Sequence, residues 1–83
     1  MENKIYYKDS VGRDLKGIDH SEAKRIISKI EKTLRHDTEA GKLFKNSEYH
    51  SLRVGNYRVI YIKVRDGVLV TRIGHRKDVY DNL

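Results

Sequence analysis

Basic side chains gather near the end of this sequence, in a stretch that otherwise reads as paired β-strands. The stretch YRVIYIKVRDGVLVTRIGHRKDVY covers residues 57–80 and contains Arg58, His75 and Arg76. A guanidinium group stays charged at any working pH, and its planar fork matches two oxygens of a phosphate. Histidine has an unperturbed pKa near neutrality, so it can exchange protons there. Together these residue types could bind a phosphate group and move a proton beside it.

Two tight turns determine which of these side chains meet across the strands. Asp66-Gly67 is a dipeptide typical of two-residue hairpin loops, and Gly55-Asn56 also suits such a loop. With these residues at the turn centres, Arg53 pairs with Arg58, and Arg58 pairs with His75. We therefore expect these three basic residues to form one row across three strands, at the far edge of the core-facing side of the sheet.

The same register divides the apolar residues of these strands between the two faces of the sheet. Side chains alternate along a strand, so residues two apart share a face. One face, which we expect to be the core, carries Ile60, Ile62, Val64, Leu69, Thr71 and Ile73. The opposite and wetter face carries Tyr61, Lys63, Arg65, Val68, Val70 and Arg72.

A row of like charges across a sheet is unfavourable, so it requires an anion nearby. The anion could be an external ligand. It could equally come from this chain, since Glu48 or Asp78 would neutralise the row and make it a structural ion-pair network. Arg76 follows the row directly, and strict alternation sends it to the other face unless a bulge at Gly74 re-aims it.

The preceding half of the chain must position these strands. Residues 4–7 (KIYY) are aromatic and β-branched, as in a strand. A short helix follows, with Asp9 or Ser10 as its N-cap and Gly17 as its stop. Residues 19 to about 35 then carry an apolar stripe with the 3.6-residue period of a helix, and residues 36–48 read as a connector. The order β-α-α-β-β-β predicts an α+β fold, with a mostly antiparallel sheet and two N-terminal helices packed on one face.

The composition limits the kinds of protein this chain can be. Its 83 residues suffice for one domain, which we place at 1–83. The net charge of +6, from 18 Lys and Arg against 12 Asp and Glu, indicates either a surface for a polyanion or an acidic protein partner. Without cysteine there are no disulfides or thiolate zinc sites, and no apolar run approaches the ~20 residues of a membrane span. We therefore expect a cytoplasmic protein with no metal, no cofactor and no membrane contact.

The segments LRVGNYRVIY and GHRKDVY carry a resemblance to a known family. From residue 52 to residue 80 the sequence resembles the RelE/ParE superfamily of toxins from type II toxin–antitoxin systems, and it is closer to the RelE-like branch. The similarity extends over most of the chain. It implies a metal-independent endoribonuclease that cleaves mRNA in the ribosomal A site by attack of the ribose 2′-OH on the adjacent phosphorus. It also implies three partners: the ribosome, its mRNA and a cognate antitoxin that forms a hetero-oligomer with the toxin.

The resemblance also implies roles for particular residues. Arg58 matches the arginine that stabilises transition-state charge, Arg76 the arginine at the phosphate or leaving group, and Tyr80 the tyrosine that orients or stacks on the substrate. Further contacts to RNA are expected from Arg53, Lys42 and Lys45, which would meet the phosphate backbone without regard to sequence.

The sequence departs from the family where proton transfer is expected. Lysines of the family just before the L-R segment are replaced here by Tyr49 and Ser51. His50 and His75 are then the candidates for the general acid or base, although each could also be a histidine without a role. The missing lysines favour a second hypothesis, a ParE-like inhibitor of DNA gyrase without nuclease activity, whereas GHRKDVY counts against it. A third possibility is a degenerate member that keeps only antitoxin binding.

Overall fold

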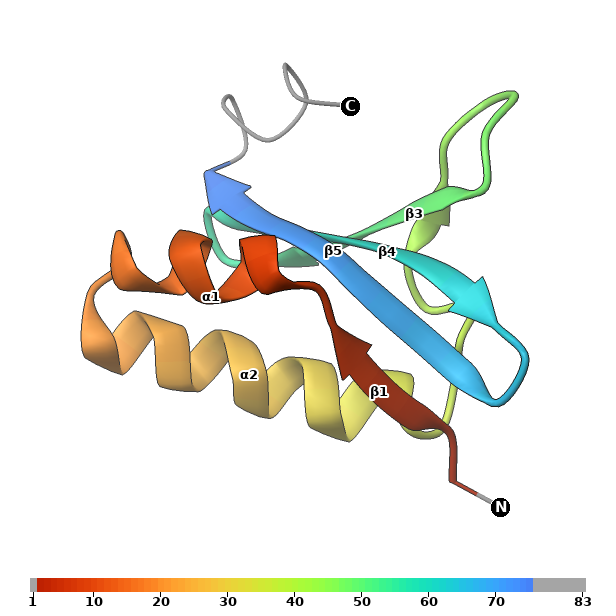
Figure 1. Cartoon of the computed structure of the whole chain (residues 1–83), viewed down its shortest axis with the longest axis horizontal. Coiled ribbons are helices and arrows are strands. Elements are labelled where there is room, and N and C mark those ends of the chain that lie inside the picture. The colour runs from red at the N-terminus through yellow and green to blue at the C-terminus, as the bar shows by residue number, and fades with distance from the viewer. Residues whose placement is uncertain (1, 76–83) are drawn as a thin grey trace.

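The chain folds into two helices and a five-stranded sheet, as seen in a computed structural model that describes residues 2–75. Figure 1 shows both helices on one side of the sheet. The elements in chain order are β1 (Lys4–Tyr7), α1 (Asp9–Lys16), α2 (His20–Leu34), β2 (Lys42–Leu43), β3 (Tyr49–Val54), β4 (Tyr57–Val64) and β5 (Gly67–His75). The predicted α+β class and the order of its main elements are confirmed. Arg76, Asp78 and Tyr80 lie outside the described residues.

The strands are arranged in the order β1-β5-β4-β3-β2, so the first strand of the chain pairs with the last. β1 runs parallel to β5, while the other neighbours are antiparallel. The sheet is therefore mixed, although most of its pairings are antiparallel as predicted. The short strand β2 was not predicted. It lies at the sheet edge within the segment that the sequence indicated only as a connector, and its Lys42 pairs with Ser51 of β3.

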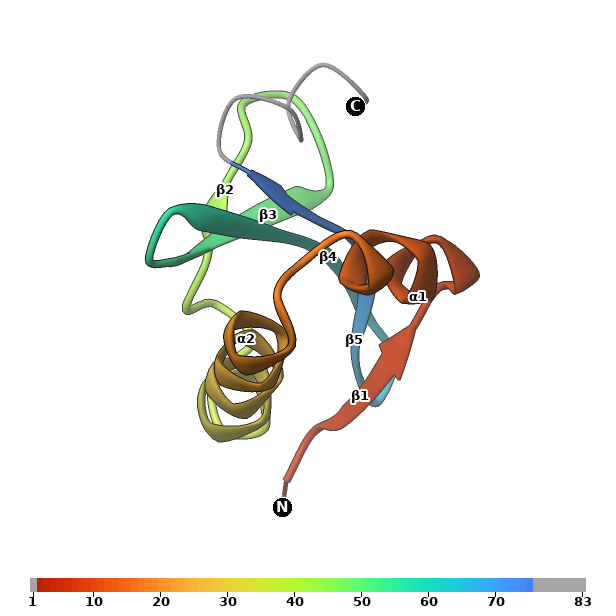
Figure 2. The same ribbon diagram turned by 90° about the vertical axis from the view of Figure 1, so that its left-hand side faces the viewer.

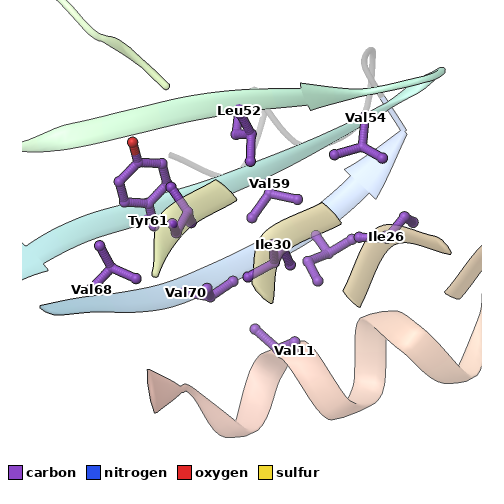
Figure 3. Packing of buried hydrophobic residues seen from close by; sticks show 11 residues of the cluster. Val11, Ile26, Ile30, Leu52, Val54, Val59, Tyr61, Val68 and Val70 are labelled. Carbon is purple, nitrogen blue, oxygen red and sulfur yellow. The ribbon is translucent and has the colours of Figure 1, made fainter. Parts of the chain in front are cut away.

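The two helices differ in how they begin, and both cover the sheet with their apolar residues. Asp19 is the N-cap of α2 and accepts a hydrogen bond from the Ser21 amide, whereas α1 begins at Asp9 after Lys8, with no side-chain cap. Figure 2 shows α2 under β3 and β4 and α1 beside β5. Figure 3 shows the core between these layers; its buried helical residues are Val11, Ile26, Ile30 and Leu34. Within residues 2–75, neither helix has the length and apolarity required to cross a membrane.

The β3–β4 hairpin has the predicted register. Val54 pairs with Tyr57 and Arg53 with Arg58, so Gly55-Asn56 forms the two-residue loop. Gly55 has a φ of 61°, and Asn56 is not among the described residues with positive φ. A positive φ at the first central position alone is the pattern of a type II′ turn, which places glycine there.

The predicted register of the β4–β5 hairpin is wrong. Val64 pairs with Gly67, so the loop consists of Arg65-Asp66. β1 contacts this loop, since Lys4 pairs with Gly67 and its amide donates to the carbonyl of Asp66 at 2.9 Å. A Cβ atom at position 67 would lie 1.8 Å from the Lys4 carbonyl oxygen. Glycine is required here because two backbones approach closely, not because a turn needs a positive φ.

A bulge shifts the register further along the same hairpin. Tyr61 pairs with Val70 and Ile60 with Arg72, which leaves Thr71 as the extra residue of β5. Beyond the bulge, Arg58 pairs with Gly74 instead of the predicted His75. The shifted turn alone would place Ile73 opposite Arg58, and the extra residue moves the pairing back by one position to Gly74. The predicted row of three basic residues is therefore broken, and only its Arg53–Arg58 pair remains.

The predicted core face of β4 and β5 is also wrong for most of its residues. The side chains that pack with the helices include Val59, Tyr61, Val68, Val70 and Ile73. Of these, only Ile73 was predicted to face the core. The bulge at Thr71 lies between Val70 and Ile73, so these two residues face the same side although they are three positions apart. Both alternating sets in β4 are apolar, so the strand pattern could not decide which set faces the helices.

Candidate functional site

Basic side chains gather on the side of the sheet that faces away from α2. Paired residues of neighbouring strands point to the same face, and alternation assigns to this face Lys42 of β2, Ser51 and Arg53 of β3, and Arg58 of β4. The opposite alternation set, which includes Leu52 and Val54, packs with the helices. We refer to Lys42, Ser51, Arg53 and Arg58 together as the basic face.

A pocket of about 440 Å³ opens on the basic face. Three of its lining residues carry a positive charge, one carries a hydroxyl group, and two are apolar. They are Lys42, Leu43, Phe44, Lys45, Ser51 and Arg58. Within the described part of the chain, no carboxylate lines the pocket. The pocket therefore presents concentrated positive charge next to an apolar wall, and we call it the Arg58 pocket.

Arg58 differs from several other arginines of the chain in its hydrogen bonding. Its Nε atom is buried and has no hydrogen-bond partner among residues 2–75. In contrast, Arg72 donates to both carboxylate oxygens of Asp14, at 3.0 and 3.1 Å. A buried charged donor without an acceptor costs free energy. Arg58 therefore keeps a hydrogen-bonding capacity that the described residues do not use.

Glu48 does not neutralise the predicted row of basic residues. In the described residues Glu48 forms no ion pair with Arg53 or Arg58. It lines a different pocket, together with Glu39 and Lys63. Asp78, the other candidate for this role, lies outside the described residues.

The two candidate histidines are not brought together with Arg58. His50 is only 3% exposed, and its ring stacks on Tyr61 with a centroid distance of 4.9 Å. Its Nδ1 atom lies 3.3 Å from the carbonyl oxygen of Gly41. His75 pairs with Tyr57, and the two rings meet edge-on with a centroid distance of 5.4 Å. Because each pairs with a residue from the helix-facing set, both histidines belong to the opposite side of the sheet.

The other predicted RNA-binding residues lie on or near the basic face. Arg53 is exposed, directly across the strands from Arg58, and its Nε atom donates to the Gly55 carbonyl at 3.3 Å. Lys42 and Lys45 are exposed and line the pocket. On β5, Arg58 faces Gly74, which has no side chain to fill the adjacent space. The sequence therefore identified the cations of the pocket and, through the resemblance, the position of Ser51, but it missed Leu43 and Phe44, for which it carried no functional signal.

The arrangement can bind a ligand that carries both a phosphate and an apolar group. Two ammonium groups and a guanidinium group would neutralise phosphate oxygens, and the guanidinium can form charge-assisted hydrogen bonds with them. Leu43 and Phe44 could contact a base or another flat apolar group. In the part of the pocket that the structure describes, the side-chain hydrogen-bond donors are the two lysines, Arg58 and the hydroxyl group of Ser51.

Comparison with known proteins gives one family and several related folds. The family described as the ParE toxin of the type II toxin–antitoxin system parDE matches residues 5–80 of this chain. The toxin–antitoxin complex RelBE2 from Mycobacterium tuberculosis is similar in structure, with a TM-score of 0.80, 22% identity, and coverage of 94% of this chain and 95% of that chain. No curated protein sequence matches the chain.

Two further solved structures share the fold over almost their whole length. The RelB–RelE antitoxin–toxin complex from Methanococcus jannaschii has a TM-score of 0.72 and 26% identity, over 94% of this chain and 98% of that chain. YafQ from E. coli strain BL21(DE3) has a TM-score of 0.60 and 16% identity, over 95% of this chain and 99% of that chain.

Proposed function

We propose that this chain, which belongs to the family of ParE toxins of type II toxin–antitoxin systems, is a ribosome-dependent endoribonuclease that cleaves mRNA in the ribosomal A site. The resemblance to the RelE/ParE superfamily is confirmed by the family match and by the solved relatives. The observation that carries the nuclease proposal is the buried, unpaired Nε atom of Arg58 in a pocket lined by lysines. The relative at 26% identity, a chain of a RelB–RelE complex, supports the RelE-like branch.

The proposed reaction depends chiefly on positive charge that stabilises its transition state. The ribose 2′-hydroxyl group loses its proton to water as its oxygen forms a bond to the adjacent phosphorus, and the bond from phosphorus to the 5′-oxygen breaks. The products are a 2′,3′-cyclic phosphate and, once the 5′-oxygen has taken up a proton, a 5′-hydroxyl group. Negative charge accumulates on the phosphorane oxygens along this path. Arg58 would stabilise this charge with a partly buried guanidinium group carried by a strand. Lys42 and Lys45 would hold the neighbouring phosphates.

The leaving 5′-oxygen requires a proton, and in this proposal a pocket lysine supplies it. His50 and His75 do not line the Arg58 pocket, whereas Lys42 and Lys45 do. A lysine ammonium is a recognised general acid. Lys42 also pairs with Ser51, one of the positions where the superfamily places a lysine. The neighbouring strand would thus supply the ammonium group that β3 lacks.

Two residues beyond β5 complete the proposed site. Arg76 would act at the phosphate or at the leaving group, and Tyr80 would orient or stack on the substrate, as the resemblance implies for these positions. Both lie outside the described residues. If these roles are correct, variants at Arg76 and Tyr80 should lose cleavage in the same assay that tests Arg58.

The proposed partners are the ribosome with its mRNA and a cognate antitoxin. Solved relatives of this fold are described as toxin–antitoxin complexes. The net charge of +6 supports both RNA and an acidic antitoxin as partners. We propose that the antitoxin neutralises the toxin by forming a hetero-oligomer with it.

A translating-ribosome assay with toeprinting tests the nuclease proposal. Wild-type protein should produce truncated mRNA with breaks in the A-site codon, and Arg58→Ala should lower the cleavage rate by about 10²–10³, as expected for loss of one donor to a developing oxyanion. Arg65→Ala is the matched control, because Arg65 is exposed in the β4–β5 loop and lines no part of the pocket. Intact mRNA on ribosomes saturated with the protein would refute the proposal.

Inhibition of DNA gyrase is the second candidate function. It is favoured by the ParE description of the matching family and by Tyr49 and Ser51 at positions where RelE-like toxins carry lysines. A supercoiling assay separates the two candidates. Loss of supercoiling at protein concentrations that leave mRNA intact on ribosomes would establish the gyrase function in place of the nuclease.

A further inference from the structure

Strand β2 carries an important part of the pocket but is weakly held as a strand. It has only two residues and lies at the edge of the sheet, so β3 is its single strand neighbour. Isolated strands of this length have little stability of their own. Nevertheless β2 presents Lys42, and the residues immediately after it include Phe44 and Lys45, which also line the pocket. Some other contact must hold this segment if its cations are to stay beside Arg58.

The hydroxyl group of Tyr61 makes such a contact. It accepts a hydrogen bond from the amide of Gly41 at 2.8 Å and donates one to the carbonyl of Thr38 at 2.8 Å. Gly41 directly precedes Lys42, while Tyr61 is fully buried on β4. Figure 3 shows the Tyr61 oxygen directed away from Val70 and Ile30, at the margin of the core. One side chain thereby ties the segment that leads into β2 to the centre of the sheet.

Two aromatic rings define the position of Gly41. The His50 ring stacks on the Tyr61 ring with an interplanar angle of 14°, and His50 Nδ1 lies 3.3 Å from the Gly41 carbonyl oxygen. A Cβ atom at position 41 would lie 2.8 Å from both the hydroxyl oxygen and a ring carbon of Tyr61. The backbone therefore approaches the ring as closely as a glycine allows.

We propose that Tyr61 is a positioning residue, whose hydroxyl group holds the segment 38–41 so that Lys42 lies beside Arg58 in the pocket. Tyr61 points to the helix side of the sheet and does not touch the RNA, and it acts only through β2. His50 supports the same contact as a structural partner and not as a proton shuttle. The effect of Tyr61 on cleavage rests on the proposed function, whereas its effect on the backbone at Gly41 does not.

Tyr61→Phe is the direct test, because it removes the hydroxyl group and keeps the ring that packs in the core. Tyr7→Phe is the matched control, since the Tyr7 hydroxyl donates to Glu31 at 2.9 Å, away from β2. Amide hydrogen exchange by NMR should show faster exchange at Gly41 in Tyr61→Phe only. In the ribosome assay, kcat should fall about tenfold to a hundredfold, as for other small displacements of a catalytic group.

A double-mutant cycle with Lys42→Ala shows whether the effect passes through Lys42. If it does, Tyr61→Phe lowers kcat in the wild-type background but changes it little when Lys42 is already absent. An equal loss of kcat in both backgrounds would overturn the proposal. An unchanged rate of amide hydrogen exchange at Gly41 would also overturn it. Gly41→Ala gives a second approach, since its added methyl group meets the Tyr61 ring and should also lower kcat in a Lys42-dependent way.

A failed nuclease proposal would remain distinguishable from a failed positioning proposal. If the wild-type protein cleaves no mRNA, the affinity for a single-stranded 2′-deoxy oligonucleotide, which cannot react through a 2′-OH group, replaces kcat in the same cycle. Faster exchange at Gly41 together with a Lys42-dependent loss of affinity would then support Tyr61 as a positioning residue. Unchanged exchange or unchanged affinity would overturn it.

Discussion

Replacing Arg58 with methionine should make the protein more stable and nearly inactive. Methionine has a similar length and an apolar chain, so the Arg58→Met variant keeps much of the packing while it removes the charge. In the wild-type protein the Nε atom of Arg58 is buried without a partner among residues 2–75. Arg53 also lies directly opposite on β3. Both features destabilise the free protein, and both are expected to help it bind an anion.

The size of the effect follows from these two features. An unpaired buried donor costs about 1–3 kcal/mol, and like charges paired across strands repel by about 0.2–1 kcal/mol. Arg58 is only partly buried, so solvent screens some of this cost and the lower end applies. We expect the free energy of unfolding to rise by about 1 kcal/mol, which corresponds to a Tm increase of about 4–8 °C for a domain of this size. Cleavage should fall by about 10²–10³.

Arg72→Met is the control for the same chemical change at a paired arginine. Arg72 donates two hydrogen bonds to Asp14, at 3.0 and 3.1 Å, and so joins β5 to α1. Its loss should lower the free energy of unfolding by about 1–3 kcal/mol. Thermal unfolding followed by circular dichroism, together with single-turnover cleavage on ribosomes, measures both variants. If Arg58→Met melted at a lower temperature, as Arg72→Met should, the guanidinium group of Arg58 would be structural and the reasoning from its unpaired Nε atom would be refuted.

Three other changes test separate parts of the structure. Gly67→Ala should destabilise the fold strongly or prevent expression, because the added Cβ atom would lie 1.8 Å from the Lys4 carbonyl oxygen; a wild-type Tm would show that β1 does not pack at this position. Burial and the hydrogen bond to Glu31 raise the pKa of Tyr7, so this side chain stabilises the fold fully below the unfolded-state pKa of about 10 and loses that contribution as the pH rises above it. Tyr7→Phe should therefore flatten the fall in stability between about pH 10 and 12 in denaturant titrations, and an unchanged slope would contradict the assignment. Lys45→Ala should reduce the salt dependence of RNA binding by about one phosphate contact, measured by fluorescence anisotropy at several salt concentrations; an unaltered slope would remove Lys45 from the RNA contact.

Much of the secondary structure could be predicted from local sequence. The strand at residues 4–7, the helix stop at Gly17, the N-cap at Asp19 and the loop at Gly55-Asn56 all agree with the structure. Each depends on interactions between residues a few positions apart, such as helix capping or the backbone preference of glycine in a tight turn. Local patterns carry this information directly. The same patterns, together with the resemblance, identified Arg58 and the lysines as candidates.

Beyond the Arg53–Arg58 pair, which the Gly55-Asn56 turn predicted, the tertiary structure decided which of those residues meet. The register of β5 depends on the parallel pairing of Gly67 with Lys4 of β1, a strand at the opposite end of the sequence, and on the bulge at Thr71. The shifted turn displaced His75 from the position opposite Arg58, and the bulge reversed only part of this displacement, so Gly74 pairs with Arg58. The strand that brings Lys42 to the pocket is two residues long, too short to show any periodicity. A local pattern can predict that a strand forms, but its register and the side chains beside it depend on partners that are distant in sequence, and only the folded chain brings those partners together.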